Sequence, residues 1–271
     1  MSDRPSRRGR RPAPALLLLA AAPLAALLVV PVAALLVRAL APEALATLTL
    51  PVALDAIRLS LLTSGLALAL TVAFGTPLAY LLARVRFPGR GLLDALVDLP
   101  VVLPPVVAGV ALLLVFGRRG WLGAPLAEAG VDLAFTTTAV VLAQAFVASP
   151  FYVRALKVAF AAVPRELEGA ARTDGATRLA AFVRITAPLA APGFVEGALL
   201  AWARALGEFG ATIVFAGSIA GRTRTLPLAI YATLERDLDA AVALAGLLTA
   251  VALAIFLLVR AVGRASTPRR R

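Results

Sequence analysis

The sequence contains no cysteine, no histidine and only one methionine among its 271 residues. Without cysteine, disulfides and thiolate metal sites are excluded, and without histidine the commonest metal ligand and neutral-pH proton carrier is missing. The chain also lacks a GxxxxGK[ST] phosphate loop, so it does not use ATP in the manner of a P-loop enzyme. Much ordinary enzyme chemistry is thereby excluded, and we expect no cofactor, no metal site and no catalytic residues.

Acidic residues are scarce as well. The chain has 15 Asp and Glu against 27 Lys and Arg, a formal net charge of +12, and 61% of its residues are hydrophobic. A chain this apolar has too few polar residues to cover the surface of a water-soluble protein. The composition therefore predicts an all-α integral membrane protein. A bilayer core of about 30 Å needs about 20 apolar residues of helix. Six segments are therefore predicted to span the membrane: 12–38, 59–84, 99–117, 133–154, 189–216 and 240–261.

The distribution of basic residues predicts the orientation of these spans. An even number of spans puts both termini on one side, and if that side is cytoplasmic, 19 of the 27 basic residues lie inside and seven outside. This excess is what the positive-inside rule requires. Segments 1–11 and 263–271 are then basic cytoplasmic tails, 155–188 is a cytoplasmic loop and 117–132 is an outer loop. Because the basic residues follow the topology and form no patch, we expect no nucleic-acid partner.

Residues 163–188, VPRELEGAARTDGATRLAAFVRITAP, form the one long polar stretch inside this otherwise hydrophobic sequence. Apolar residues recur among the charged ones with a period of roughly 3.6 residues, the period of an α-helix. This pattern predicts two short amphipathic helices with Gly175 near their joint. From periodicity alone, this stretch could equally be a solvated loop between two membrane helices. The order of six residues nevertheless resembles the EAA loop of bacterial ABC-importer permeases: Glu168, Ala170, Ala171, Gly175, Ile185 and Pro188. Gly169 and Ala187 depart from the usual pattern.

The resemblance implies a fold and a set of partners. Residues 55–262 would form the core of a type I ABC importer permease, and the loop residues named above would couple it to a cytoplasmic ATPase. The family further implies a homodimer in the bacterial cytoplasmic (inner) membrane, with two ATPase subunits below it. An extracytoplasmic oxyanion-binding protein would deliver the cargo.

The fifth predicted span holds the ionisable residues that lie deepest in the bilayer. On a helix, Arg204, Glu208 and Thr212 fall on one face with Gly197 and Ala201. A charge within the membrane normally faces a partner or a watery cavity. Arg204 and Glu208 can therefore form a structural ion pair beside a groove of small residues, or this face can line a translocation path in which Arg204 favours an anion. Both interpretations can hold together.

The same region resembles one branch of the family. ARALGEFGATIVFAG, followed by TRTLPLAIY at 223–231, is similar to the fifth helix and outer loop of molybdate-importer permeases, whereas sulfate permeases often have tyrosine where Phe209 stands. DLPVVLPPVVAG also looks like the equivalent region of oxyanion-importer permeases. The resemblance implies import of molybdate or tungstate, with sulfate or thiosulfate as the near alternative. An ion-driven secondary transporter is less favoured, because the sequence shows no inverted half-repeat.

Three further expectations concern individual residues. Asp94 and Asp98 are four residues apart, and we expect them to be salt-bridge partners at the membrane edge; the alternative is an acid/base pair of a membrane-embedded enzyme. Gln144, in the fourth predicted span, is expected to hydrogen-bond to a neighbouring helix. Prolines interrupt the start of the third predicted span and preclude a straight helix there: Pro100, Pro104 and Pro105.

Overall fold

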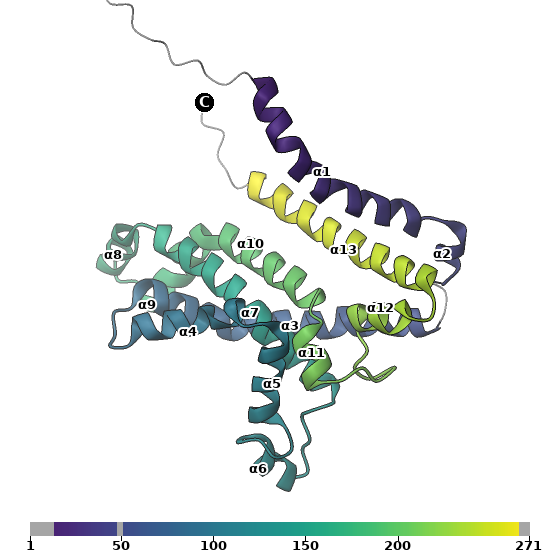
Figure 1. Cartoon of the computed structure of the whole chain (residues 1–271). Coiled ribbons are helices and arrows are strands. Elements are labelled where there is room, and N and C mark those ends of the chain that lie inside the picture. The colour runs from purple at the N-terminus through teal and green to yellow at the C-terminus, as the bar shows by residue number, and fades with distance from the viewer. Residues whose placement is uncertain (1–13, 48–50, 266–271) are drawn as a thin grey trace, which may run out of the picture.

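The computed structural model describes residues 14–47 and 51–265, and within these ranges helices are the only regular secondary structure. The basic tail 1–11 and most of the tail 263–271 lie outside the described residues. Among the described residues, five helical segments are long and apolar enough to cross a membrane, or six if a bent helix pair is counted as one span. One of the five, Arg178–Leu206, includes the short helical turns that precede its main helix. The main helices of the five segments are α1 (Pro14–Ala39), α3 (Pro51–Arg84), α7 (Thr137–Ala162), α10 (Ala187–Leu206) and α13 (Leu238–Ala265). The predicted all-α membrane architecture is confirmed (Figure 1).

The third predicted span, 99–117, is not a single straight helix. Helix α4 (Arg90–Val102) and helix α5 (Pro105–Phe116) meet at a bend of 118°. A proline disfavours the helical conformation at the residue before it, and Leu103 and Pro104, each followed by a proline, have extended ψ values of 133° and 135°. The expectation from the prolines is thus correct. The 12 residues of α5 extend only about 18 Å, less than a bilayer core.

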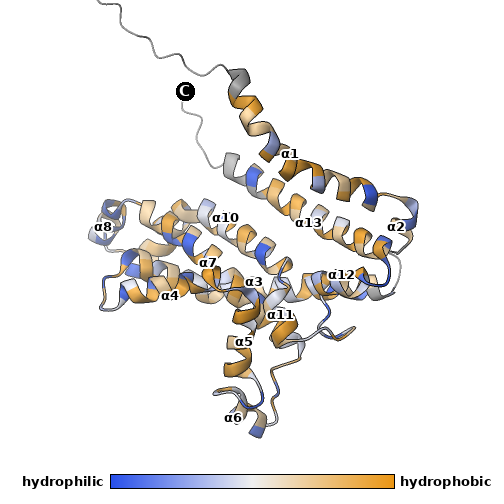
Figure 2. Cartoon of the chain, viewed as in Figure 1, coloured by the Kyte–Doolittle hydropathy of each residue, from blue (hydrophilic) through white to orange (hydrophobic). Residues whose placement is uncertain are grey.

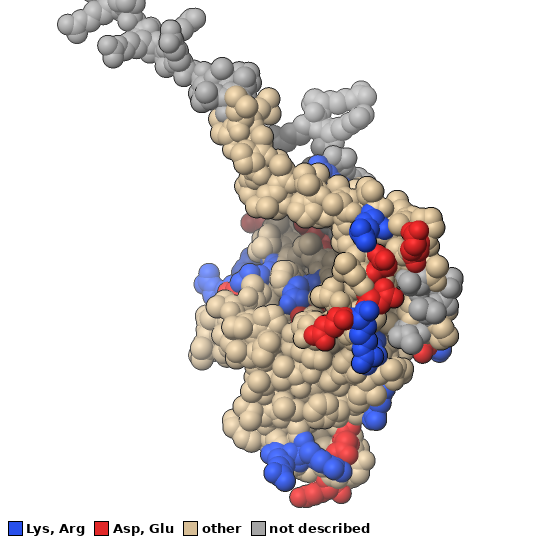
Figure 3. Space-filling view, turned by 45° about the vertical axis from the view of Figure 1, so that its right-hand side comes forward, with Lys and Arg blue, Asp and Glu red and all other residues tan. Residues whose placement is uncertain are grey.

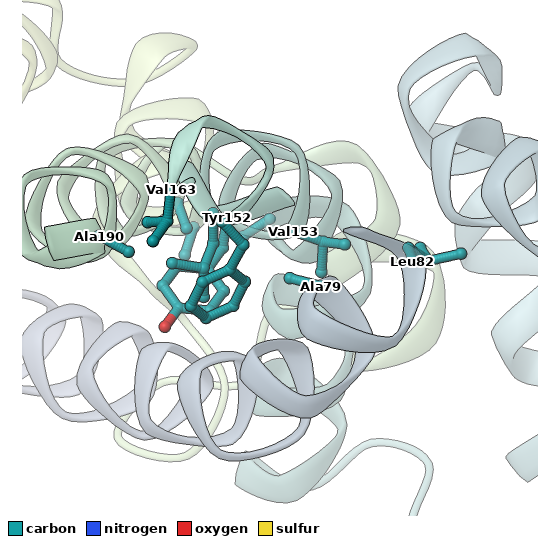
Figure 4. Packing of buried hydrophobic residues seen from close by; sticks show 11 residues of the cluster. Ala79, Leu82, Tyr152, Val153, Val163 and Ala190 are labelled. Carbon is teal, nitrogen blue, oxygen red and sulfur yellow. The ribbon is translucent and has the colours of Figure 1, made fainter. Parts of the chain in front are cut away.

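Helices α3, α7 and α10 form the centre of the fold. Tyr152 of α7 is fully buried and lies between Ala190 of α10 and Ala79 of α3 (Figure 4). The hydroxyl of Tyr152 is satisfied by the hydroxyl of Thr76 at 2.8 Å, because a buried phenol needs a hydrogen-bond partner. Small residues allow the close approach: a Cβ added to Gly193 of α10 would lie 2.2 Å from the Cβ of Ala159. Close contacts of this kind are typical of helix packing in lipid.

The fourth predicted span is longer at its carboxyl end than expected. Helix α7 begins after Thr136, whose hydroxyl accepts a hydrogen bond from the N–H of Ala139, a standard helix cap. It runs to Ala162, so residues 155–162, which the sequence interpretation assigned to the cytoplasmic loop, continue the helix. The loop proper therefore starts at Val163.

Short helices fill the connections between the spans: α2 (Pro42–Thr47), α6 (Gly123–Glu128) and α12 (Leu226–Leu234). None of them was predicted from the sequence. Helix α12 is fixed to α3 by a hydrogen bond from the N–H of Leu226 to the hydroxyl of Ser60, at 2.6 Å. Figure 1 shows α5 and α6 projecting as an arm from the layer of α3, α7 and α10.

Apolar residues cover the outside of the spans. Leu18 and Leu27 of α1 are 71% and 69% exposed, as expected for side chains that face lipid. Orange, hydrophobic stretches run along the helices in Figure 2, and the face in Figure 3 has a broad uncharged area with charged residues at its margins. Trp121, in the loop between α5 and α6, is 87% exposed, which fits an anchor at the membrane–water interface.

Candidate coupling site and intramembrane ion pair

The polar loop folds as two short helices, as predicted. Helix α8 (Arg165–Thr173) and helix α9 (Arg178–Ala181) are separated by Gly175, which has a φ of +90°. Glycine adopts this left-handed conformation without the steric cost that a Cβ brings. The N–H of Ala176 donates to the carbonyl oxygen of Ala171 at 2.9 Å, and the N–H of Asp174 to that of Ala170 at 3.0 Å. The glycine therefore ends α8 and lets its last carbonyl groups be satisfied.

Helix α8 has no buried residue, so its attachment to the spans depends on polar contacts, and Glu168 makes them. The carboxylate of Glu168 lies 3.6 Å from the guanidinium of Arg84, at the end of α3, and accepts a hydrogen bond from Thr186 at 2.5 Å. Arg84 also donates to the carbonyl oxygen of Val163, just after α7, at 2.7 Å. One glutamate and one arginine thus connect α8 to α3, to α7 and to the start of α10.

Thr186 lies at the end of a π-helical turn, η1 (Phe182–Thr186), that leads directly into α10. Isolated π-helical turns are rare and often occur at functional sites. Ile185, in this turn, is half-buried, whereas Pro188 is exposed and stands in the first turn of α10, where a proline costs no hydrogen bond. The structure therefore brings Glu168 and the Ile185 segment together across the loop.

Arg84 and Thr186 were not among the predicted site residues. The position of Arg84 in the sequence could have indicated its role. It is the first cation after a long apolar span, where an arginine near the membrane edge needs a partner of opposite charge. Thr186 had none, because its role depends on the π-helical turn, which no sequence pattern indicated.

The two aspartates of α4 are paired with cations of α7. Lys157 lies 2.5 Å from Asp94, and Arg154 forms an ion pair with Asp98. The expected salt bridges are thus present, and both carboxylates are engaged in attaching α4 to α7. The acid/base alternative has no support from this geometry.

Arg204 and Glu208 form the ion pair that their spacing allows. Their charged groups are 2.7 Å apart, with the side chain of Glu208 1% exposed and that of Arg204 29% exposed. The other carboxylate oxygen of Glu208 accepts a hydrogen bond from the N–H of Ala211 at 2.8 Å. Because α10 ends at Leu206 and α11 (Gly210–Phe215) begins after a break, Glu208 holds the two helices together.

The structure corrects the sequence expectations for Thr212 and Gln144. The fifth predicted span, 189–216, is interrupted at Gly207, so Thr212 lies on α11 and not on the helical face of Arg204. Thr212 is fully buried, and its hydroxyl has no hydrogen-bond partner among the described residues. Gln144 of α7 is also fully buried, and neither end of its amide has a partner in the same part of the chain. The expected hydrogen bond from Gln144 to a neighbouring helix is therefore wrong.

Comparison with known proteins identifies the family. Residues 75–271 match the family model described as the inner membrane component of binding-protein-dependent transport systems. The chain belongs to this family. It is thus a multi-pass membrane permease, the transport component of an ABC importer system, and the predicted type I importer permease fold is confirmed.

Relatives of this permease have names that specify a cargo. A Mycobacterium tuberculosis protein named molybdenum transport system permease is 47% identical over 227 residues, which cover 84% of this chain and 86% of the relative. The Escherichia coli K12 protein of the same name is 48% identical over 182 residues, 67% of this chain and 80% of the relative. A probable sulfate transport system permease of Nephroselmis olivacea is 38% identical over 212 residues, with coverage of 77% and 75%.

A solved structure resembles the permease over most of its length. The crystal structure of a bacterial ABC transporter that imports the acidic polysaccharide alginate contains a chain with a TM-score of 0.73 and 21% identity. The match covers 94% of this chain and 95% of that chain. The likeness at this level of identity shows the shared fold.

Proposed function

We propose that this permease moves molybdate or tungstate into the cytoplasm, driven by ATPase subunits that dock on α8. The two relatives described above that are named for molybdenum transport are 47% and 48% identical to it, against 38% for the relative named for sulfate. The chain lacks a phosphate-binding loop of its own, so energy must come from a partner. The transport subunit itself would therefore carry no ATPase site.

The attachment of α8 supports this coupling role above all. A helix with no buried residue that is nevertheless bound by Glu168 to Arg84 and Thr186 can follow a docked partner and pull on the spans. Displacement of α8 would be transmitted to α3 directly and to α10 through the π-helical turn. Rigid spans would convert that motion into alternating openings toward the two sides of the membrane.

The remaining partners and the orientation follow from the same proposal. A second copy of the chain would complete the membrane domain, in the bacterial inner membrane, and an external binding protein would deliver the oxyanion to it. Both termini would be cytoplasmic, since that orientation leaves 19 of the 27 basic residues inside.

Arg204, Glu208 and Thr212 would belong to the region through which the oxyanion passes. The three residues surround the break between α10 and α11. The side chain of Arg204 is the only one of them that is more than slightly exposed, at 29%. A partly exposed guanidinium inside the membrane attracts an anion while Glu208 keeps the residue in place. The ion pair can thus serve both structure and transport.

Reconstitution into proteoliposomes tests the proposal. The permease, its ATPase and its binding protein should take up labelled molybdate only when ATP is supplied to the ATPase. Unlabelled tungstate should compete as well as molybdate, whereas sulfate should compete poorly. Better competition by sulfate would make the sulfate alternative correct, and uptake that follows an ion gradient without ATP would make the chain a secondary transporter.

A further inference from the structure

A cavity lies behind α8. It has a volume of about 700 Å³ and is lined by the end of α3, by α8, by α9 and by the start of η1. Neither Arg204 nor Glu208 takes part in it, so it is separate from the intramembrane ion pair. Its charged lining residues are Arg84, Arg165, Glu168, Arg172 and Arg178.

The cavity has a net charge of +3, from four arginines and one glutamate. Glu168 is already engaged by Arg84 and Thr186. In the described part of the chain, no carboxylate lies within 4.0 Å of the guanidinium of Arg165, Arg172 or Arg178. Three guanidinium groups around one cavity repel each other unless an anion is present.

Arg84 adds a second, independent observation. Its side chain is only 6% exposed, and its Nε–H has no hydrogen-bond acceptor among the described residues. A buried N–H of a charged group without an acceptor is costly, so such groups are normally satisfied by protein, water or a ligand. The unpaired donor of Arg84 therefore points to a missing acceptor at this cavity.

Apolar side chains also line the cavity. They are Pro77 and Tyr80 of α3, Leu179 of α9 and Phe182 of η1, and the rings of Tyr80 and Phe182 pack edge to face with their centroids 5.2 Å apart. A ligand that fills the whole volume would place an anionic group among the arginines and an uncharged part against these residues. A small anion would contact the arginines alone.

We propose that this cavity binds a phosphate-type tetrahedral oxyanion, held by Arg172 and Arg178 with Arg84 beneath them. Guanidinium groups match the oxygens of such anions with paired hydrogen bonds, and the dianion would offset most of the local positive charge. The oxyanion can come from a free ion in the cytoplasm or from the headgroup of an anionic phospholipid. Because the bound group would bridge α3 to α8 and α9, it would also restrain the coupling helix.

The test uses the full-length chain, purified in detergent. The double variant Arg172→Gln/Arg178→Gln removes two exposed arginines of the cavity, and Arg90→Gln/Arg184→Gln is the matched control. The control arginines are exposed and do not line the cavity, and their substitution removes the same amount of charge. Unchanged thermal unfolding midpoints in both variants will show that both remain folded.

One arm measures the binding of inorganic phosphate by calorimetric titration, and the other measures the binding of phosphatidylglycerol against phosphatidylcholine by native mass spectrometry. We expect binding in one arm, weakened about tenfold or more in the cavity variant, since charge-assisted hydrogen bonds are lost, and changed less than about twofold in the control. Binding in the first arm identifies a free oxyanion, and binding in the second alone identifies a lipid headgroup. No binding in either arm, or equal loss in both variants, overturns the proposal. Neither outcome depends on whether the permease carries molybdate.

Discussion

Arg204 brings a positive charge into a region surrounded by apolar helices, and Glu208 makes this possible. The carboxylate neutralises Arg204 with one oxygen and caps the first turn of α11 with the other. Spacing of four residues was enough to predict the pair. It could not predict that α10 ends between the two residues, because a single Gly207 inside an apolar run does not by itself end a helix.

A double-mutant cycle at this pair measures its contribution. Arg204→Ala and Glu208→Ala should each lower the thermal unfolding midpoint in detergent, because each leaves a partner charge unpaired, at a cost of about 3 kcal/mol for a buried pair. The double variant should lose less than the sum, with a coupling energy between about 0.5 and 3 kcal/mol. Additive losses would show that the two side chains do not stabilise each other.

Measuring uptake by the Arg204→Ala variant distinguishes a role of Arg204 in transport from a purely structural role. We expect the variant to insert into the membrane but to take up less molybdate than the wild type in proteoliposomes, because the cation that attracts the anion is gone. Unchanged uptake would leave Arg204 with a structural role alone.

At the scale of elements, the sequence predicted the types of helix well and their ends poorly. The amphipathic period predicted α8, α9 and the joint at Gly175, and hydropathy predicted the long spans. It did not predict the extension of α7 to Ala162, the π-helical turn or the short helices α2, α6 and α12. The start of α12 is fixed by a contact with a distant residue, the hydrogen bond from the N–H of Leu226 to the hydroxyl of Ser60. Contacts between residues far apart in the chain leave no periodic signal.

Substitution of Gly175 tests the joint between α8 and α9. Gly175→Val should lower substrate-stimulated ATP hydrolysis and uptake, since a β-branched residue at a φ of +90° strains the backbone by about 1–2 kcal/mol. Gly130→Val is the control, because Gly130 has a φ of +82° and equally open surroundings, but lies in the loop between α6 and α7. Gly175→Asn should be milder, as asparagine tolerates this conformation. Full activity in Gly175→Val would contradict the coupling role.

Gly193 tests the packing of α10 against α7. A Cβ at Gly193 would lie 2.2 Å from the Cβ of Ala159, so Gly193→Ala must push the helices apart and should lower stability by about 1–3 kcal/mol. Gly65→Ala on α3 is the matched comparison, since a Cβ there meets nothing within 4 Å, and should be neutral or stabilising by up to about 1 kcal/mol. Thermal unfolding in detergent measures both, and equal midpoints would refute the close-packing argument.

At the scale of the whole molecule, the lack of cysteine allows the orientation to be measured directly, because any introduced cysteine is unique. Trp121→Cys should react with a membrane-impermeant maleimide in intact cells, and Thr173→Cys only after the cells are made permeable. Both positions are exposed in the structure. The reverse pattern of labelling would invert the proposed topology.

The exposed position of α8 also has a consequence for local stability. With no buried residue in α8 and twelve in α7, the two helices should open with very different free energies, since burial of apolar contacts sets the resistance to local unfolding. In hydrogen-exchange mass spectrometry, amides of α8 should exchange long before those of α7. The helix proposed to contact the ATPase could then change its shape repeatedly while the membrane spans stay folded.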